Sequence, residues 1–389
     1  MAFPSNNGEH DTAPISENAI FHLLSVLPTY IPDTSPFRNV RSLDWGIQTN
    51  TTLLQLPALL RLMPQLKELS VSLQATINIP NHHRLLYTLA LIPLHNLRYF
   101  EMDSFALYGI EEEIQLSLAE LLRSKQESLV HVSMMGVPTG TPPIQALAGI
   151  HGLTHLESSP PFSAAITLPP PFSSSLHHHF SEIAGNCLNI RVLRLHIGQD
   201  ERHNEGLTSF TFNTLRPLAA CRFLMEFQVI AERAQQLSLQ EGDIEEIGTA
   251  WPDLQILHLD AFSGSDQHDS GIPIFWLSLF ASSMPNLVGI SLPFNGWADI
   301  PMSNTSQRSF NQSVFIGVEE RPPFNAINLL GNYFHNTCPS NLQIVENASG
   351  SGFHMPGATE RQYHSPVKRE IGSEWLAVEE EVRRLRGTL

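Results

Sequence analysis

The amino-acid sequence predicts an α/β solenoid, in which strand–helix units stack so that their strands form one parallel sheet. The first supporting observation is a recurring nine-residue motif, bulky-Pro-x-Leu-x-x-Leu-x-Leu, whose clearest copies lie at 63–71, 251–259 and 284–292. The second is helical periodicity between the copies. A repeated motif implies one structural unit repeated in space. Such arrays bind through extended surfaces, so we expect function to depend on a surface rather than on an enclosed active site.

Nine copies of the motif align on a first apolar anchor, and each interval between anchors is long enough for one strand, one helix and two turns. The first anchors are Val40, Leu66, Leu97, Leu129, Leu153, Ile190, Leu224, Leu254 and Leu287. Two more anchors follow after three and five residues, with Ser158 as the one polar exception. The residue between these two is polar in every copy, and we call this set the polar column: Asp44, Ser70, Glu101, Ser133, Glu157, Arg194, Gln228, His258 and Ser291. Alternation along a strand predicts buried anchors on one face and a solvated polar column on the other.

Buried helical stripes are predicted in the intervals between the motifs. Ile114, Leu118 and Leu121 recur at helical spacing, and a second stripe spans 244–251. The stretch 274–280 also indicates a packed helix. Strands that alternate with helices form a parallel sheet with right-handed crossovers. We therefore expect strands on the concave face of the solenoid and helices on its convex face.

The predicted domain organisation has four parts. They are an N-terminal tail with a capping helix at 1–36, the solenoid at 37–347, a flexible linker at 348–372 and a C-terminal amphipathic helix at 373–389. Two loop insertions are expected within the solenoid, near 136–175 and 293–323, because the first is rich in Pro and Ser and the second is polar. A solenoid needs its ends covered, so the C-terminal helix is expected to serve as a cap.

Acidic residues outnumber basic residues by 38 to 22, which gives the chain a formal charge of −16. Phosphate recognition needs clustered positive charge, so neither nucleic acid nor an anionic membrane is an expected partner. No apolar run reaches the length of a membrane span, and no secretory signal is visible at the N-terminus. These features predict a cytoplasmic or nuclear protein.

The three cysteines share one place in the repeat. Cys187 and Cys221 each stand three residues before a first anchor, and Cys338 stands four residues before Leu342. Bulky apolar residues hold this place in other copies, so the cysteines are interpreted as buried, reduced fillers. Zinc ligands normally occur at Cys-x₂₋₄-Cys spacing, which this chain lacks.

Three polar clusters each have a functional and a structural interpretation. Consecutive helical residues point in different directions, so His177, His178 and His179 indicate an exposed helix start rather than a metal site. The sequence Asp-Gln-His-Asp at 266–269 favours a solvated loop over an acid–base group. Lys368 lies in a four-residue sequence that resembles a SUMO acceptor, and matches this short often arise by chance. No nucleophile elbow or phosphate-binding glycine loop occurs, so we predict no catalytic residue, metal or cofactor and no enzymatic activity.

The central strands carry the richest set of candidate binding residues. These protein-binding candidates are Arg194, His196, Glu226, Gln228, His258 and Asp260. Three adjacent strands would present them as one patch on the order of 10 Å wide. Arginine offers a bidentate donor, and the acids and histidines offer complementary groups that orient a protein ligand. The alternative is that any solvated sheet face carries such residues and that the long loops make the contact.

The Leu-x-x-Leu-x-Leu strand motif resembles that of leucine-rich repeats over about residues 40–345. The sequences at 214–221 and 243–254 are similar to the leucine-rich-repeat region of the F-box proteins of mushroom-forming fungi. That resemblance implies a substrate receptor of a ubiquitin ligase, whose repeats bind an unidentified target and whose F-box binds the ligase adaptor. No Leu-Pro-x-Glu sequence typical of an F-box is found, and 21–28 indicates only a short amphipathic helix. The alternative is a free-standing repeat scaffold unrelated to ubiquitin.

Overall fold

The computed structural model divides into two compact units. The first comprises residues 1–169 with 185–190, and the second comprises 170–184 with 191–389. The structure describes residues 37–47, 49–73, 79–104, 112–159, 172–197, 209–231, 236–259, 272–292, 294–295, 310, 314–318, 322, 324–338, 342–346 and 373–387. The expected tail at 1–36 and linker at 348–372, together with Asp260, 266–269 and Lys368, lie outside these residues.

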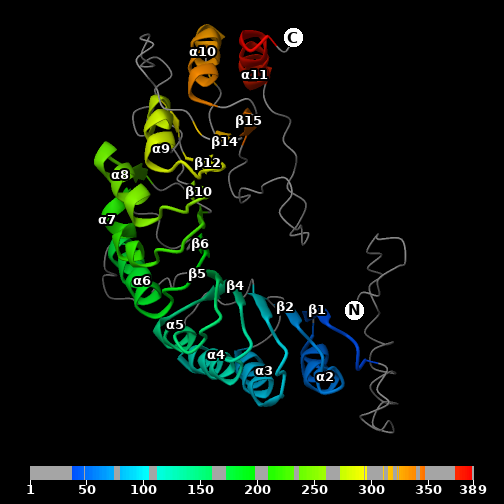
Figure 1. Ribbon diagram of the computed structural model, residues 1–389. Helices are drawn as coiled ribbons and strands as arrows, with labels where there is room; N and C mark the ends of the chain where they lie inside the picture. The colour runs from blue at the N-terminus through cyan, green and yellow to red at the C-terminus, as the bar shows by residue number, and fades with distance from the viewer. Residues whose placement is uncertain are drawn as a thin grey trace. The chain divides into compact units, whose positions relative to one another are not determined.

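The first unit alternates strands with helices, and its strands follow one another in chain order (Figure 1). The strands are β1 (Ser42–Ile47), β2 (Glu68–Leu73), β3 (Tyr99–Ser104), β4 (His131–Pro138) and β5 (His155–Ser159). The helices are α2 (Asn50–Leu60), α3 (Ile79–Leu91), α4 (Glu112–Ser124) and α5 (Thr141–Leu147). Every pair of neighbouring strands in this unit is parallel.

The second unit follows the same plan, with strand order β6-β8-β10-β12-β14-β15 and parallel pairing throughout. These strands are β6 (Val192–Ile197), β8 (Glu226–Ala231), β10 (Ile256–Leu259), β12 (Gly289–Ser291), β14 (Val314–Val318) and β15 (Leu342–Glu346). The helices are α6 (Phe172–Asn186), α7 (Phe212–Leu215), α8 (Glu241–Ala250), α9 (Leu277–Ser283), α10 (Ile327–Thr337) and α11 (Ser373–Leu385), with 3₁₀ turns η3 (Arg216–Ala220), η4 (Ile274–Trp276) and η6 (Phe324–Ala326). Two short parallel pairs join β7 (Ser209–Thr211) to β9 (Gln236–Ser238) and β11 (Ile272–Pro273) to β13 (Phe294–Asn295). The fold is an α/β leucine-rich-repeat solenoid.

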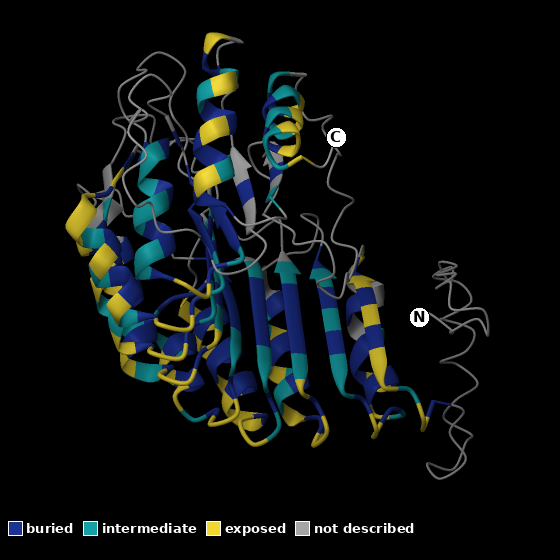
Figure 2. Ribbon diagram, turned by 45° about the horizontal axis from the view of Figure 1, so that its top comes forward, coloured by how far each residue is buried: buried dark blue, intermediate teal, exposed yellow. Residues whose placement is uncertain are grey.

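The anchors form the core of both units, as the motif predicted. All second and third anchors are buried, including the polar exception Ser158. The first anchors are buried too, apart from Val40, which is half-buried. Because β1 ends the strand order of its unit, no described strand precedes it to cover Val40. Figure 2 shows the resulting pattern, with buried residues along the strands and exposed residues on the outer surfaces of the helices and turns.

A tight turn leads into each strand and explains the bulky-Pro-x-Leu sequence. The first anchor donates its N–H to the carbonyl three residues before it, as Leu66 does to Met63 (3.1 Å) and Leu287 to Met284 (3.1 Å). Proline suits the second position of such a turn because its φ is already fixed there and its missing N–H is not needed. The bulky first residue points into the core, and Met63 and Met284 are both buried.

The residue that follows a first anchor joins one repeat to the next at seven places in the described part of the chain. The carbonyl of Arg41 accepts hydrogen bonds from the N–H groups of both Lys67 (2.7 Å) and Glu68 (3.0 Å). The same double acceptance recurs at Lys67, Arg98, Val130, Arg191, Met225 and Gln255. Since one carbonyl has two lone pairs, this arrangement satisfies two backbone donors and aligns the following strand in register.

Side chains at the ends of helices also reach back to the preceding repeat. The Lys125 ammonium group donates to the carbonyls of Ala90 (3.1 Å) and Ile92 (2.5 Å) at the C-terminal end of α3. The indole N–H of Trp251 donates to the carbonyl of Leu218 in η3 (3.0 Å). Carbonyls at a helix C-terminus lack partners within the helix, so these donors satisfy groups that burial would otherwise leave unpaired. Burial lowers the pKa of Lys125 below its ordinary value.

The helical stripes lie where periodicity predicted them. Ile114, Leu118 and Leu121 are buried on α4, and the stripe at 244–251 is buried on α8. The N-terminus of α8 is closed by a capping box, in which Asp243 accepts the N–H of Gln240 (2.8 Å). No helix among the described residues has both the length and the apolar character that crossing a membrane requires.

The two stretches expected as loop insertions contain regular structure. Within 136–175 the structure places α5 and β5. Within 293–323 it places β14, which pairs with β12 on one side and β15 on the other. Strand β14, Val-Phe-Ile-Gly-Val, lacks the bulky-Pro turn in front of it, so the motif could not reveal this strand.

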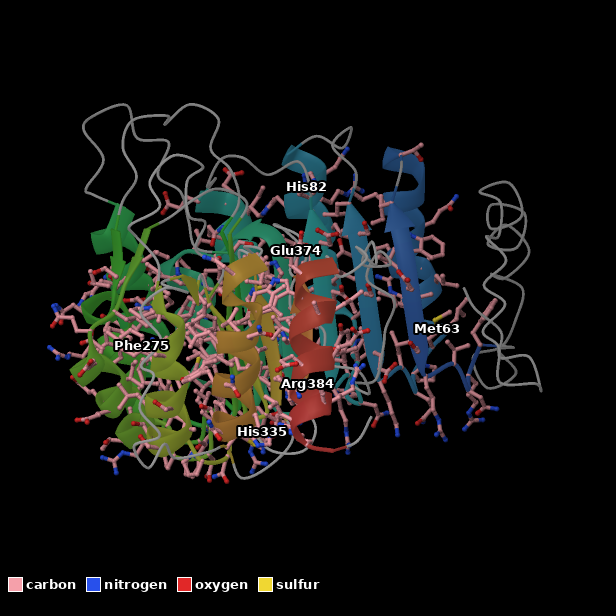
Figure 3. The ribbon with its side chains drawn as sticks, turned by 90° about the horizontal axis from the view of Figure 1, so that it is seen from above. Met63, His82, Phe275, His335, Glu374 and Arg384 are labelled. Atoms are coloured by element: carbon pink, nitrogen blue, oxygen red, sulfur yellow. The ribbon has the colours of Figure 1, made fainter. Side chains whose placement is uncertain are left out.

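Helix α11 packs against α10 and strand β15 at the end of the second unit (Figure 3). Its buried stripe comprises Trp375, Val378 and Val382. The carboxylate of Glu379 accepts the N–H of Ile344 (2.9 Å), which belongs to the last strand in the order. At Gly331 of α10 a Cβ would lie 2.5 Å from the side chain of Glu381, so glycine permits the close approach of the two helices. The contacts of α11 thus cover an edge strand that would otherwise expose its backbone.

Replacing Leu257 by Asp is expected to lower the free energy of unfolding of the second unit by more than about 4 kcal/mol, because an unpaired carboxylate would enter a fully buried position. Chemical denaturation followed by tryptophan fluorescence measures the change. Phe223→Asp is the control, since Phe223 is an exposed residue of the same unit. Equal stability of the two variants would contradict the buried position of the anchor.

Replacing Trp375 by Ala is expected to destabilise the second unit by about 3–5 kcal/mol, because it removes a fully buried indole from the α10–α11 contact. Its neighbour Leu376 is largely exposed, so Leu376→Ala should cost little and serves as the matched control. Differential scanning calorimetry compares the two. Similar melting curves would show that α11 does not stabilise the repeats.

Candidate functional site

The strand layer of the second unit aligns three of the expected binding residues in one row. Arg194 on β6, Gln228 on β8 and His258 on β10 are register partners across neighbouring strands. Glu226 stands two residues before Gln228 on β8. Its carboxylate accepts hydrogen bonds from Arg194 Nε (2.5 Å) and Gln228 Nε2 (2.8 Å). The three side chains therefore form a linked polar group that spans β6 and β8.

The exposure of this group differs from the solvated face that we expected. Gln228 and His258 are buried, His196 is half-buried, and the side chains of Arg194 and Glu226 are 31% and 13% exposed. Arg194 thus offers the most accessible donor of the Arg194–Glu226–Gln228 group.

Most of the polar column is also buried, so the prediction of one fully solvated strand face is wrong. The buried members are Glu101, Ser133, Glu157, Gln228, His258 and Ser291. A hydrogen bond between neighbouring strands makes the burial of two members tolerable, because Ser133 Oγ donates to Glu157 Oε2 (2.7 Å). Asp44 at the first strand stays exposed.

The first unit carries a row of stacked rings that the sequence reasoning missed. Tyr99, His131 and His155 are register partners on β3, β4 and β5. The ring centroids of Tyr99 and His131 lie 4.3 Å apart, and those of His131 and His155 lie 5.2 Å apart with nearly parallel planes. The Tyr99 hydroxyl donates to Glu101 Oε2 (2.8 Å). Half-buried rings with polar edges are groups that protein interfaces favour.

The sequence contains a pattern that predicts this row of rings. Tyr99, His131 and His155 each stand two residues after a first anchor, on the same strand face as the polar column. Comparing this second position across the repeats would have found three adjacent ring-bearing side chains.

The histidine run separates into exposed and buried members on α6. His177 and His178 are exposed, and His177 Nδ1 lies 3.0 Å from the carbonyl oxygen of Asn213. His179 is buried, and burial lowers its pKa to about 4, with a smaller contribution from His178. Within the described ranges, no three His, Cys, Asp or Glu side chains lie close enough together to hold a metal ion.

The cysteines occupy the place that the repeat assigned to them. None of Cys187, Cys221 and Cys338 forms a disulfide, and all three are buried. Cys187 and Cys221 accept the turn hydrogen bonds of Ile190 (3.3 Å) and Leu224 (3.1 Å), as Met63 does in its own repeat. Burial raises the pKa of Cys221 to about 11 and that of Cys338 to about 12, so neither forms the thiolate that nucleophilic chemistry needs at neutral pH.

Comparison with known proteins gives matches among solved structures alone; no family model and no curated protein matches the chain. One match is the leucine-rich repeat-containing protein LegL7 from Legionella pneumophila, with 12% identity, a TM-score of 0.45, and coverage of 90% of this chain and 98% of that one. Another is a chain of the Rad7 and Elc1 complex in yeast, with 13% identity, a TM-score of 0.46, and coverage of 85% and 74%.

Acidification is expected to destabilise the second unit through His179. Its pKa is lowered in the folded protein, so its stabilising contribution is present above pH 6.5 and is lost as the pH falls toward 4. The loss should be on the order of 3 kcal/mol, from the size of the shift. Urea denaturation between pH 7 and pH 4 measures it, with His179→Phe as the variant and His178→Phe as the exposed control. An equal pH dependence in both variants would exclude His179 as the cause.

Proposed function

We propose that this chain is a protein-interaction scaffold that recognises a protein target with its strand layer. The observation that carries the proposal is the Arg194–Glu226–Gln228 group, where a partly exposed guanidinium is held in place by a neighbouring carboxylate. An arginine fixed in this way has already lost much of its rotamer freedom, so a partner carboxylate or carbonyl can bind it at a low entropic cost.

In its finer form, the proposal is that the chain is the target-recognition part of an F-box-type ubiquitin ligase receptor. The two sequences that carry the F-box resemblance occupy equivalent places: 214–221 covers the end of α7 and η3 before β8, and 243–254 covers most of α8 and the turn that leads to β10. Both are thus the helix-and-turn part of a repeat. We further propose a cytoplasmic or nuclear location, where such a ligase would act. A free-standing scaffold would use the same surface and differ only in lacking the ligase adaptor.

Purification of the tagged protein from its own cells, followed by quantitative mass spectrometry, separates these two functions. Recovery of a cullin-ligase adaptor together with a target supports the receptor. Recovery of a target without an adaptor supports the free-standing scaffold. Recovery of no protein above the level of an untagged control would contradict both.

Charge reversal at Arg194 is expected to reduce target recovery by about tenfold, because the new glutamate would lie beside Glu226 and remove the donor. Arg216→Glu is the matched control. Arg216 pairs with Glu246 (2.9 Å) in the same unit, but this pair lies on the helix side and is exposed. Equal recovery with Arg194→Glu and Arg216→Glu, at unchanged melting temperatures, would place the target elsewhere.

A further inference from the structure

A second candidate surface lies on the helix side of the first unit, where α2 and α3 are neighbours (Figure 1). A pocket of about 200 Å³ opens between the two helices. Its lining residues are Leu53, Pro57, Ala58, Arg61, Arg84, Leu85 and Thr88. Leu53, Pro57 and Leu85 are buried and form an apolar floor, whereas Ala58, Arg61 and Arg84 are exposed at the rim.

The charge around this pocket is opposite to that of the chain as a whole. The protein carries 38 acidic and 22 basic residues, yet neither α2 nor α3 contains an aspartate or glutamate. Arg61 and Arg84 approach the pocket from different helices. Within the described part of the chain, neither arginine makes a side-chain hydrogen bond or an ion pair, whereas Arg123, Arg194, Arg216, Arg383 and Arg384 are all paired with glutamates.

Large apolar side chains extend this surface along α3. Tyr87 is 52% exposed and Leu91 is 66% exposed. Each follows a pocket residue, Arg84 or Thr88, at a spacing of three, so it lies on the adjoining part of the same helix face. A patch that combines arginine, tyrosine and an apolar pocket has the composition of a protein-binding hot spot rather than of an ordinary solvated helix surface.

We propose that the α2–α3 pocket binds an acidic segment of a partner protein that also carries leucine-like side chains. One aliphatic side chain would enter the pocket and contact Leu53, Pro57 and Leu85. Carboxylates on either side would accept hydrogen bonds from Arg61 and Arg84, whose planar guanidinium groups bind carboxylates bidentately. Tyr87 and Leu91 would pack against the next turn of the same segment. This surface is distinct from the strand layer, so the two could bind different proteins.

The chemistry of the pocket favours a protein segment over nucleic acid. An apolar floor of this size gains energy from an aliphatic side chain, whereas a phosphate backbone offers none. Nucleic-acid binding also depends on many phosphate contacts, and a chain with a net charge of −16 repels that polyanion at longer range.

The test uses the whole protein and a fluorescein-labelled synthetic peptide in which glutamate and leucine recur at helical spacing. Fluorescence anisotropy should show saturable binding to the unaltered protein. Arg61→Gln/Arg84→Gln should weaken binding by about fivefold, as expected for two partly exposed charge pairs. Arg191→Gln/Arg222→Gln is the matched control, because it removes the same charge from two other exposed arginines. Ala58→Trp should also weaken binding, because the indole would fill the pocket from an exposed position.

Two altered peptides separate the contributions of charge and apolar contact. Glutamine in place of glutamate should weaken binding to the level of the Arg61/Arg84 variant, and serine in place of leucine should reproduce the effect of Ala58→Trp. The proposal is overturned if both double variants bind the acidic peptide equally. It is also overturned if a single-stranded oligonucleotide binds more tightly through the same arginines. A concentration-dependent dimer that Arg61→Gln/Arg84→Gln abolishes would show instead that a second copy fills the pocket.

Discussion

The backbone carbonyl one residue after a first anchor determines how the repeats join, at seven of the nine first anchors. It accepts two N–H groups from the following repeat, as at Arg41 and again at Gln255. Because both donors flank the start of the next strand, this junction fixes where that strand begins and which of its residues face the core. The turn before the junction presents the carbonyl, and the anchors after it fill the core. The turn, the junction and the anchors therefore depend on one another, which explains why the motif spans all three.

The parts of the fold that this junction controls could be read from the sequence. Leu66, Leu254 and Leu287 were placed correctly because turn, anchor and alternation coincide in each copy. Strand β14 was missed because the bulky-Pro sequence does not precede its apolar residues. Its place in the sheet is evident only from its pairing with β12 and β15. Val40 matches the motif, yet it is half-buried because burial depends on a neighbouring repeat and not on the motif itself.

The candidate site was harder to predict, for a physical reason. Alternation tells which side of a strand a residue faces, but it does not tell whether that side is solvated. Gln228 and His258 were expected on a solvated face and are buried there. The link between Arg194 and Glu226 depends on a cross-strand diagonal, and the stacking of His131 on His155 depends on a shared register. Both follow from three-dimensional pairing, which one strand read alone does not contain.

The contacts that reach back from one helix end to the preceding one give the array a direction. The side chain of Lys125 donates to a carbonyl at the end of α3, and that of Trp251 donates to a carbonyl in η3. Arg386 donates in the same way to the carbonyl of Cys338 at the end of α10 (2.9 Å). These three helix ends are thus completed by residues encoded later in the gene, and for α10 the donor lies in the segment that follows α11. Shortening the gene from its 3′ end removes such a donor and leaves carbonyls at the end of an earlier helix unsatisfied, whereas shortening it from the 5′ end removes the carbonyls and leaves a later donor such as Lys125 without its acceptors. During synthesis on the ribosome, the ends of α3, η3 and α10 would likewise remain incomplete until the later donor emerged.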